Sequence, residues 1–66
     1  MNIDVLRGKI HEKCKTGGRF AESMGWHPNK VSAMLNGKYI PDVDEAAQIA
    51  TRLDLTEATF CEIFLH

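Results

Sequence analysis

Apolar residues recur at spacings of three and four along most of the chain, and no segment alternates polar and apolar residues as a half-buried strand would. In the first segment Ile3, Leu6 and Ile10 follow this spacing, and Cys14 stands four positions further on. This is the pattern of an amphipathic helix. The whole sequence predicts an all-α fold with five helices, covering residues 3–14, 17–24, 28–36, 43–53 and 57–65.

Residues that favour helix starts precede four of these segments. Asn2, Thr16 and Thr56 carry side-chain oxygens that accept hydrogen bonds from first-turn N–H groups. Asp42 is followed three residues later by Glu45, which is the spacing of a capping box. We therefore expect side-chain caps at all four starts.

Each predicted helix has one apolar face, and together these faces define the expected core. A chain of 66 residues is too short for two cores, so we expect one domain over residues 1–66. Trp26 is expected to be buried at the turn between the second and third helices. Beyond the first helix, the predicted inner faces are Phe20, Ala21 and Met24; Val31, Met34 and Leu35; Val43, Ala46, Ala47, Ile49, Ala50 and Leu53; and Phe60, Ile63 and Phe64.

Nothing in the sequence indicates export or membrane insertion. The first ten residues lack the apolar run of a signal peptide, and no apolar run approaches membrane-spanning length. The two cysteines, Cys14 and Cys61, follow neither a zinc-ribbon nor a disulfide-scaffold spacing. These features predict a reduced, cytoplasmic protein with no membrane partner.

The formal net charge of −1 conceals a division of charge along the chain. Seven basic and three acidic residues lie up to Lys38, which gives this part a charge of +4, whereas one basic and six acidic residues follow it, for a charge of −5. A basic half of this kind suits contact with a polyanion. The alternative is chance clustering on a solvated surface, and charge alone does not separate the two.

The connection between the second and third helices is the most informative stretch. Three residues, 25–27, separate Met24 from Pro28, and proline at a first helical position loses no N–H group that the helix needs. So short a connection makes the two helices meet at a sharp angle, which is the helix-turn-helix arrangement. The outward side of the third helix would then be formed by Asn29, Lys30, Ser32 and Ala33.

The order and spacing of these features resemble the lambda-repressor and Cro-like helix-turn-helix family over roughly residues 3 to 64. The resemblance is carried by Thr16, Phe20, Ala21, Gly25, "VSAMLNGK" at 31–38 and "IPDVDEAAQIATRLDL" at 40–55. It implies a five-helix lambda-repressor-like domain that binds double-stranded DNA in a sequence-specific manner. It also implies a transcriptional regulator of the repressor or Cro-like type, and it implies no cofactor.

The family inserts the start of its third helix into the DNA major groove. By this resemblance the base contacts are Pro28, Asn29, Lys30 and Ala33. Asn29 suits adenine, Lys30 suits the guanine acceptors, and Ala33 suits a thymine methyl group. The predicted phosphate contacts are Thr16, Gly17, Gly18, Arg19, Ser32, Asn36, Lys38 and Tyr39. For the Tyr39 side chain, a place at the edge of the core is the alternative.

The chain departs from the family at the start of the second helix. Gly17 and Gly18 follow Thr16 where the family usually has a glutamine that binds phosphate. Two glycines near a helix start cost up to about 1 kcal/mol each relative to alanine. One interpretation is that bare N–H groups at the positive helix end approach phosphate closely. The other is a weakened or unusual contact.

The expected assembly on DNA is a homodimer. One domain of this size covers only a few base pairs, so we expect two copies on half-sites about one DNA turn apart. The fifth helix is the expected contact, because Leu65 and Cys61 have no evident place in its core stripe. A frayed terminus with an exposed Leu65 is the alternative.

Three other interpretations compete with DNA binding. A structural zinc would take His11, Cys14, Cys61 and His66, but neither pair has a compact ligand spacing. An enzyme is not expected, because no nucleophile has a visible base and orienting partner and no Gly-rich phosphate loop appears. The remaining alternative is a protein-interaction module such as an antitoxin or regulatory subunit, which would not require the basic first half.

Overall fold

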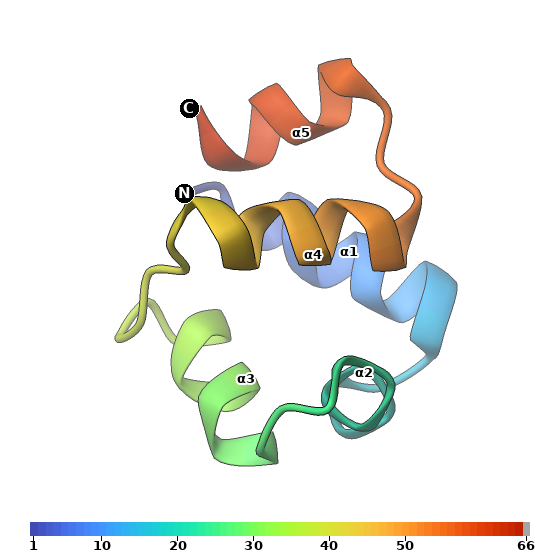
Figure 1. The fold of residues 1–66 in the computed structure, drawn as a ribbon, viewed down its shortest axis with the longest axis vertical. Coiled ribbons are helices and arrows are strands. Elements are labelled where there is room, and N and C mark those ends of the chain that lie inside the picture. The colour runs from blue at the N-terminus through green and yellow to red at the C-terminus, as the bar shows by residue number, and fades with distance from the viewer. Residues whose placement is uncertain (66) are drawn as a thin grey trace.

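Five helices make up the regular structure of the part of the chain that the computed structural model describes, residues 1–65 (Figure 1). They are α1 (Ile3–Cys14), α2 (Gly17–Met24), α3 (Pro28–Leu35), α4 (Val43–Leu53) and α5 (Glu57–Phe64). These 65 residues contain no strand, so the all-α prediction is confirmed. Two predicted helix ends are one residue too long, because Asn36 and Leu65 are the C-terminal caps of α3 and α5.

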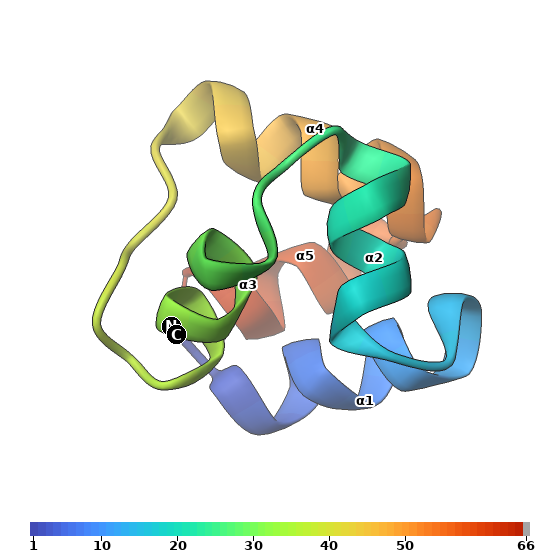
Figure 2. The same ribbon diagram turned by 90° about the horizontal axis from the view of Figure 1, so that it is seen from below.

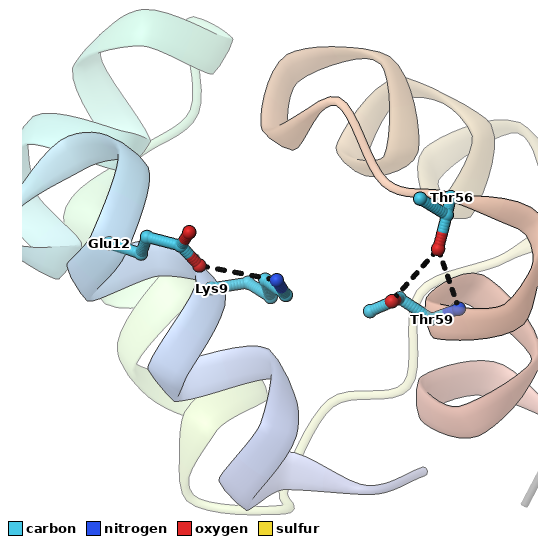
Figure 3. Close-up of polar contacts among 4 residues, drawn as sticks. All are labelled: Lys9, Glu12, Thr56 and Thr59. Carbon is cyan, nitrogen blue, oxygen red and sulfur yellow. Dashed lines mark hydrogen bonds and ion pairs between the residues drawn. The ribbon is translucent and has the colours of Figure 1, made fainter.

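The helix starts are made by the short-range hydrogen bonds that the sequence predicts. The side chains of Asn2 and Thr16 accept from the first turns of α1 and α2. Asp42 and Glu45 form the complete capping box at the start of α4. Thr56 accepts from the Thr59 N–H group at 3.1 Å and bonds the Thr59 hydroxyl at 3.0 Å (Figure 3). All four predicted caps are confirmed.

The start of α3 has a cap that the sequence analysis did not identify. The Nδ1 atom of His27 accepts a hydrogen bond from the N–H group of Asn29 at 3.0 Å. His27 itself is extended, with φ −66° and ψ 139°, as expected for a residue before proline. An imidazole nitrogen therefore takes the place of the amide, hydroxyl or carboxylate oxygen found at the other helix starts.

One core joins the five helices. Its largest fully buried side chains come from every helix and are Leu6, Phe20, Val31, Met34, Ile49, Leu53 and Ile63. Burying a side chain of this kind contributes about 1.5 to 3 kcal/mol, so the core is the main source of stability. The N–H group of Asn2 donates to the Ile63 carbonyl at 2.8 Å, which fixes the beginning of α1 beside α5. None of the helices within residues 1–65 has the length and apolar character needed to cross a membrane.

The turn between α2 and α3 depends on Gly25. Its φ of 72° lies in the left-handed region, where a side chain would be strained. This conformation lets the N–H group of Trp26 return to the Ala21 carbonyl at 2.9 Å. The half-buried Trp26 ring then packs edge-on against Phe20, with ring centroids 6.3 Å apart. The prediction that Trp26 is buried at this turn is therefore confirmed in part, because the residue packs against the core but is only half-buried.

Helices α2 and α3 cross at a steep angle. In Figure 1 α2 is seen end-on while α3 is seen from its side, and in Figure 2 the reverse holds. The three-residue turn and the contacts of both helices with the core impose this arrangement. The outward side of α3 is thereby turned away from α1, α4 and α5.

The predicted inner face of α4 was too wide. Val43 is 85% exposed and Ala47 is also exposed, whereas Ala46, Ile49 and Leu53 are buried. A helix turns by about 100° per residue, so one packed face does not hold six residues among eleven. Val43 stands at the first position of α4, and Ala47 lies one step round the helix from the buried stripe.

This difference within one helix gives a test of the core. Ile49→Ala is expected to lower the free energy of unfolding by about 2 to 5 kcal/mol, because it leaves a cavity among fully buried side chains. Val43→Ala, the matched control on the exposed side, is expected to change it by less than about 0.5 kcal/mol. Urea denaturation followed by circular dichroism measures both. Similar losses from the two variants would contradict the described packing of α4.

Candidate nucleic-acid interface

A hollow of about 310 Å³ lies where the start of α2 meets the outward side of α3. It brings together residues that the sequence analysis assigned to one surface from two separate segments. The lining residues are Arg7, Gly17, Gly18, Pro28, Val31, Ser32, Leu35 and Asn36. Five of the residues predicted to contact DNA therefore share one concave site.

The wall of this hollow at α2 is bare backbone. A Cβ atom added to Gly17 would lie 3.7 Å from Val31 and 3.8 Å from Leu35, and one added to Gly18 would lie 3.9 Å from the Thr16 hydroxyl. These are ordinary van der Waals distances, so packing within the chain does not require glycine at either position. The first N–H groups of any helix lack intrahelical acceptors and carry partial positive charge. The two glycines leave these groups open to an anion.

Arg7 is a residue of this site that the sequence analysis missed. Its Nη2 atom donates to the Leu35 carbonyl at 2.8 Å, and its Nη1 atom lies 3.6 Å from the Asp4 carboxylate. A cation at the C-terminal end of α3 satisfies an unpaired carbonyl and opposes the helix dipole. It also places a half-exposed guanidinium at the edge of the hollow. No local signal could reveal this contact, because 28 residues separate its partners.

The outward side of α3 is short and polar. Asn29, Ser32 and Asn36 are exposed, and Ala33 is half-buried between them. Pro28 lies on the flank of α3 that borders the hollow. At about 100° per residue, these positions fall on one continuous side of the helix. The structure thus groups three of the four predicted base contacts with Ser32 and Asn36.

Lys30 lies on the opposite flank of α3. Its ammonium group pairs with the Glu45 carboxylate of α4 and lies 4.2 Å from the centroid of the Trp26 ring. It also lies 5.5 Å from the centroid of the Tyr39 ring. Its side chain is 32% exposed and that of Glu45 is 14% exposed. The structure therefore does not bring the Lys30 charge together with Pro28, Asn29 and Ala33.

Tyr39 belongs to the same cluster. Its hydroxyl donates to the Oε1 atom of Glu45, and its ring packs against the core. The Asp42 N–H group donates to the same carboxylate oxygen at 3.1 Å. The hydroxyl that was considered for phosphate is thus engaged within the domain, at the edge of the core.

The cluster shifts the titration of all three side chains. The ammonium of Lys30, the hydroxyl of Tyr39 and the N–H group of Asp42 lower the pKa of Glu45 from 4.5 to about 2. The hydrogen bond to Glu45 raises the pKa of Lys30 and also that of Tyr39. At neutral pH the carboxylate and the ammonium are both charged.

Other predicted contacts lie around this surface. Thr16 caps α2 through the Arg19 N–H group at 3.1 Å, and the Arg19 side chain is exposed. Lys38 is exposed just beyond α3, where Gly37 adopts a φ of 75° and the Lys38 N–H group returns to the Ala33 carbonyl at 2.8 Å. Lys9 of α1, which was not among the predicted contacts, pairs with Glu12 at 3.2 Å on the helix surface (Figure 3).

A second surface is apolar. Ile40, Val43 and Leu65 are 77%, 85% and 72% exposed, respectively. They border a groove of about 340 Å³ whose other lining residues are Met1, Pro41, Asp42, Ala46, Phe60 and Phe64. In Figure 1, α5 and the chain ends lie at one end of the view and α2 lies at the other. We call this groove the apolar groove.

The zinc interpretation finds no support in the described residues. Cys14 is buried with the core side chains and Cys61 is half-buried on α5. His66, the fourth ligand of that interpretation, lies outside the described residues. Within residues 1–65, no three His, Cys, Asp or Glu side chains come close enough to hold a metal ion.

We compared the chain with protein-family models and with curated proteins. No protein-family model matches the chain, and no curated protein matches it significantly. The resemblance to the lambda-repressor and Cro-like family therefore rests on the residues of this chain.

The Glu45 cluster gives a pH test. A carboxylate whose pKa is lowered in the folded state stabilises the fold above pH 4.5, and the effect is lost as the pH falls towards 2. The melting temperature of the wild type is therefore expected to exceed that of Glu45→Gln near neutral pH, and the gap is expected to close between pH 4.5 and about 2. Asp44→Asn, which removes an exposed carboxylate from the same turn, should show a smaller gap. A Glu45→Gln gap that stays constant with pH would contradict the ion pair.

Proposed function

We propose that this protein binds double-stranded DNA through α3 and the first turn of α2, and that it acts as a transcriptional regulator. The observation that carries the proposal is the shared surface of a bare helix start and an exposed polar helix side around one hollow. Helix N-termini bind phosphate through their N–H groups, while exposed amides and hydroxyls on a protruding helix can reach base edges.

In this proposal the two helices have different tasks. The backbone of Gly17 and Gly18, with Thr16 and Arg19, holds phosphate oxygens and fixes the position of the protein on the duplex. Asn29 reads a base edge, with Pro28 and Ala33 in apolar contact beside it. Ser32, Asn36 and Lys38 lie along the same helix and its end, where they reach the flanking phosphates.

Charge supports the same orientation. Seven of the eight basic residues of the chain lie up to Lys38, in the part that forms α1, α2 and α3. Six of its nine acidic residues follow, in the part that forms α4 and α5. A duplex approaching α3 would therefore meet more basic than acidic residues, with the Glu45 carboxylate beside α3 already paired with Lys30.

Selection of bound sites from random duplexes, followed by substitution of Asn29, tests this function. Asn29→Ala is expected to weaken binding to the selected duplex by about 1 to 3 kcal/mol and to relax the preference at one base position. Gln48→Ala on α4 is the matched control, since it removes an exposed amide from another helix.

Two outcomes would count against this role. Equal losses on selected and random duplexes would mean that Asn29 contacts the backbone alone. Failure of the wild type to bind any duplex at low salt would reject DNA as the partner and favour the protein-interaction alternative.

We also infer that two copies associate through the apolar groove. Ile40, Val43 and Leu65 form a cluster of large exposed apolar side chains, and such clusters mark contact surfaces. Two copies would supply the second half-site that a domain covering a few base pairs needs. The groove includes Leu65, the C-terminal cap of α5 and one of the two residues for which the sequence offered no place in the core stripe.

Sedimentation of the free protein and of its DNA complex tests this association. Leu65→Asp is expected to weaken the dimer at least tenfold, because it places a charge in an apolar contact. Ala58→Asp, which adds the same charge at an exposed position of α5 outside the groove, should leave the dimer intact. A monomer that binds DNA one copy at a time, unaffected by Leu65→Asp, would exclude this interface. A pull-down that retained a different protein after nuclease treatment, and lost it with Leu65→Asp, would assign the apolar groove to another partner.

A further inference from the structure

The Glu45 carboxylate connects three parts of the chain that meet beside α3. It pairs with the Lys30 ammonium of α3. It also accepts hydrogen bonds from the Tyr39 hydroxyl, in the connection to α4, and from the Asp42 N–H group at the start of α4. The Glu45 carboxylate therefore interacts with three donor groups. Its negative charge lies directly beside α3, the helix proposed to enter the DNA major groove.

Lys30 is enclosed on more than one side. Glu45 meets its ammonium group, the Trp26 ring lies within cation–π range, and the Tyr39 ring lies slightly further away. Partly buried pairs of this kind are screened by salt much less than exposed ones. To reach DNA, Lys30 would have to leave the carboxylate and both rings.

We propose that Glu45 is a specificity-determining residue, which acts by holding Lys30 away from DNA so that α3 meets the duplex without this cation. The inference rests on the proposed function. A lysine that reaches phosphates binds every duplex alike, since phosphate contacts carry no sequence information. Withholding Lys30 leaves recognition to Asn29 and the short residues beside it, and raises the ratio of specific to non-specific affinity.

The first experiment compares Glu45→Gln with the wild type on a selected and a random duplex over a range of salt concentrations. Glutamine keeps the size of the side chain and its acceptor oxygen but removes the charge that holds Lys30. The slope of log affinity against log salt is expected to steepen by about 0.9, the value for one phosphate contact. Affinity for the random duplex is expected to rise roughly fivefold near about 0.15 M salt on the same basis. The ratio of selected to random affinity should fall.

Matched variants separate this effect from a change in net charge. Glu62→Gln removes one exposed carboxylate from α5 and should leave the slope unchanged. Lys30→Gln should keep the wild-type slope of log affinity against log salt. The double variant Lys30→Gln with Glu45→Gln should also show the wild-type slope, because it has no Lys30 to release. Lys38→Ala should lower the slope by about 1, which shows that the measurement resolves one contact.

Each result supports or rejects the inference separately from DNA binding itself. Wild-type binding with a salt-dependent slope supports the proposed function before any variant is compared. A slope lowered by about 1 in Lys30→Gln, with relaxed preference at one base pair, would show that Lys30 contacts DNA directly and would overturn the inference. A steeper slope that persists in the double variant would also overturn it, since the effect would then come from Glu45 alone. If Glu45→Gln fails to fold in a thermal melt, Lys30→Gln still decides between these outcomes.

Discussion

The left-handed conformation of Gly25 is the constraint on which the arrangement of the molecule depends. It allows the chain to close α2 with the hydrogen bond from the Trp26 N–H group to the Ala21 carbonyl and to start α3 with only three residues between the two helices. With so short a turn, α3 can reach the core only by crossing α2 steeply. Val31 and Met34 are then buried, and Asn29, Ser32 and Asn36 on the opposite side of α3 are exposed. The exposed polar side is thus a consequence of the turn as much as of its own residues.

Two long-range polar contacts hold α3 in this position, one at each flank. Arg7 of α1 donates a hydrogen bond to the Leu35 carbonyl, and Glu45 of α4 pairs with the Lys30 ammonium. Both use a charged side chain that stays partly in contact with solvent, so neither requires the full desolvation of an ion. Between them the first turn and the last residue of α3 are each tied to a different helix.

These contacts engage two of the seven basic residues up to Lys38. Arg7 and Lys30 hold helices together, whereas the side chains of Arg19 and Lys38 are exposed. The formal charge of +4 up to Lys38 therefore overstates what would be presented to a polyanion. For a protein whose total charge is −1, the proposed function therefore depends more on the bare helix start of α2, because helix N-termini can bind anions without a further cation. The apolar groove shares no lining residue with the hollow.

The sequence by itself determined the features that depend on neighbours within a few residues. The five helices, the caps at Asn2, Thr16, Asp42 and Thr56, and the turn at Gly25 all follow from hydrogen bonds and backbone preferences local to the chain. The family resemblance assigned Gly17, Gly18, Ser32 and Asn36 to one surface, and the structure places all four around one hollow. Only the tertiary structure decided which side chains form contacts between helices and which are exposed. Three features depend on how separate helices pack: the hydrogen bond from Arg7 to the Leu35 carbonyl, the ion pair of Lys30 with Glu45, and the exposure of Val43. From the sequence alone, the charged residues would be interpreted as solvated and Val43 as part of the core.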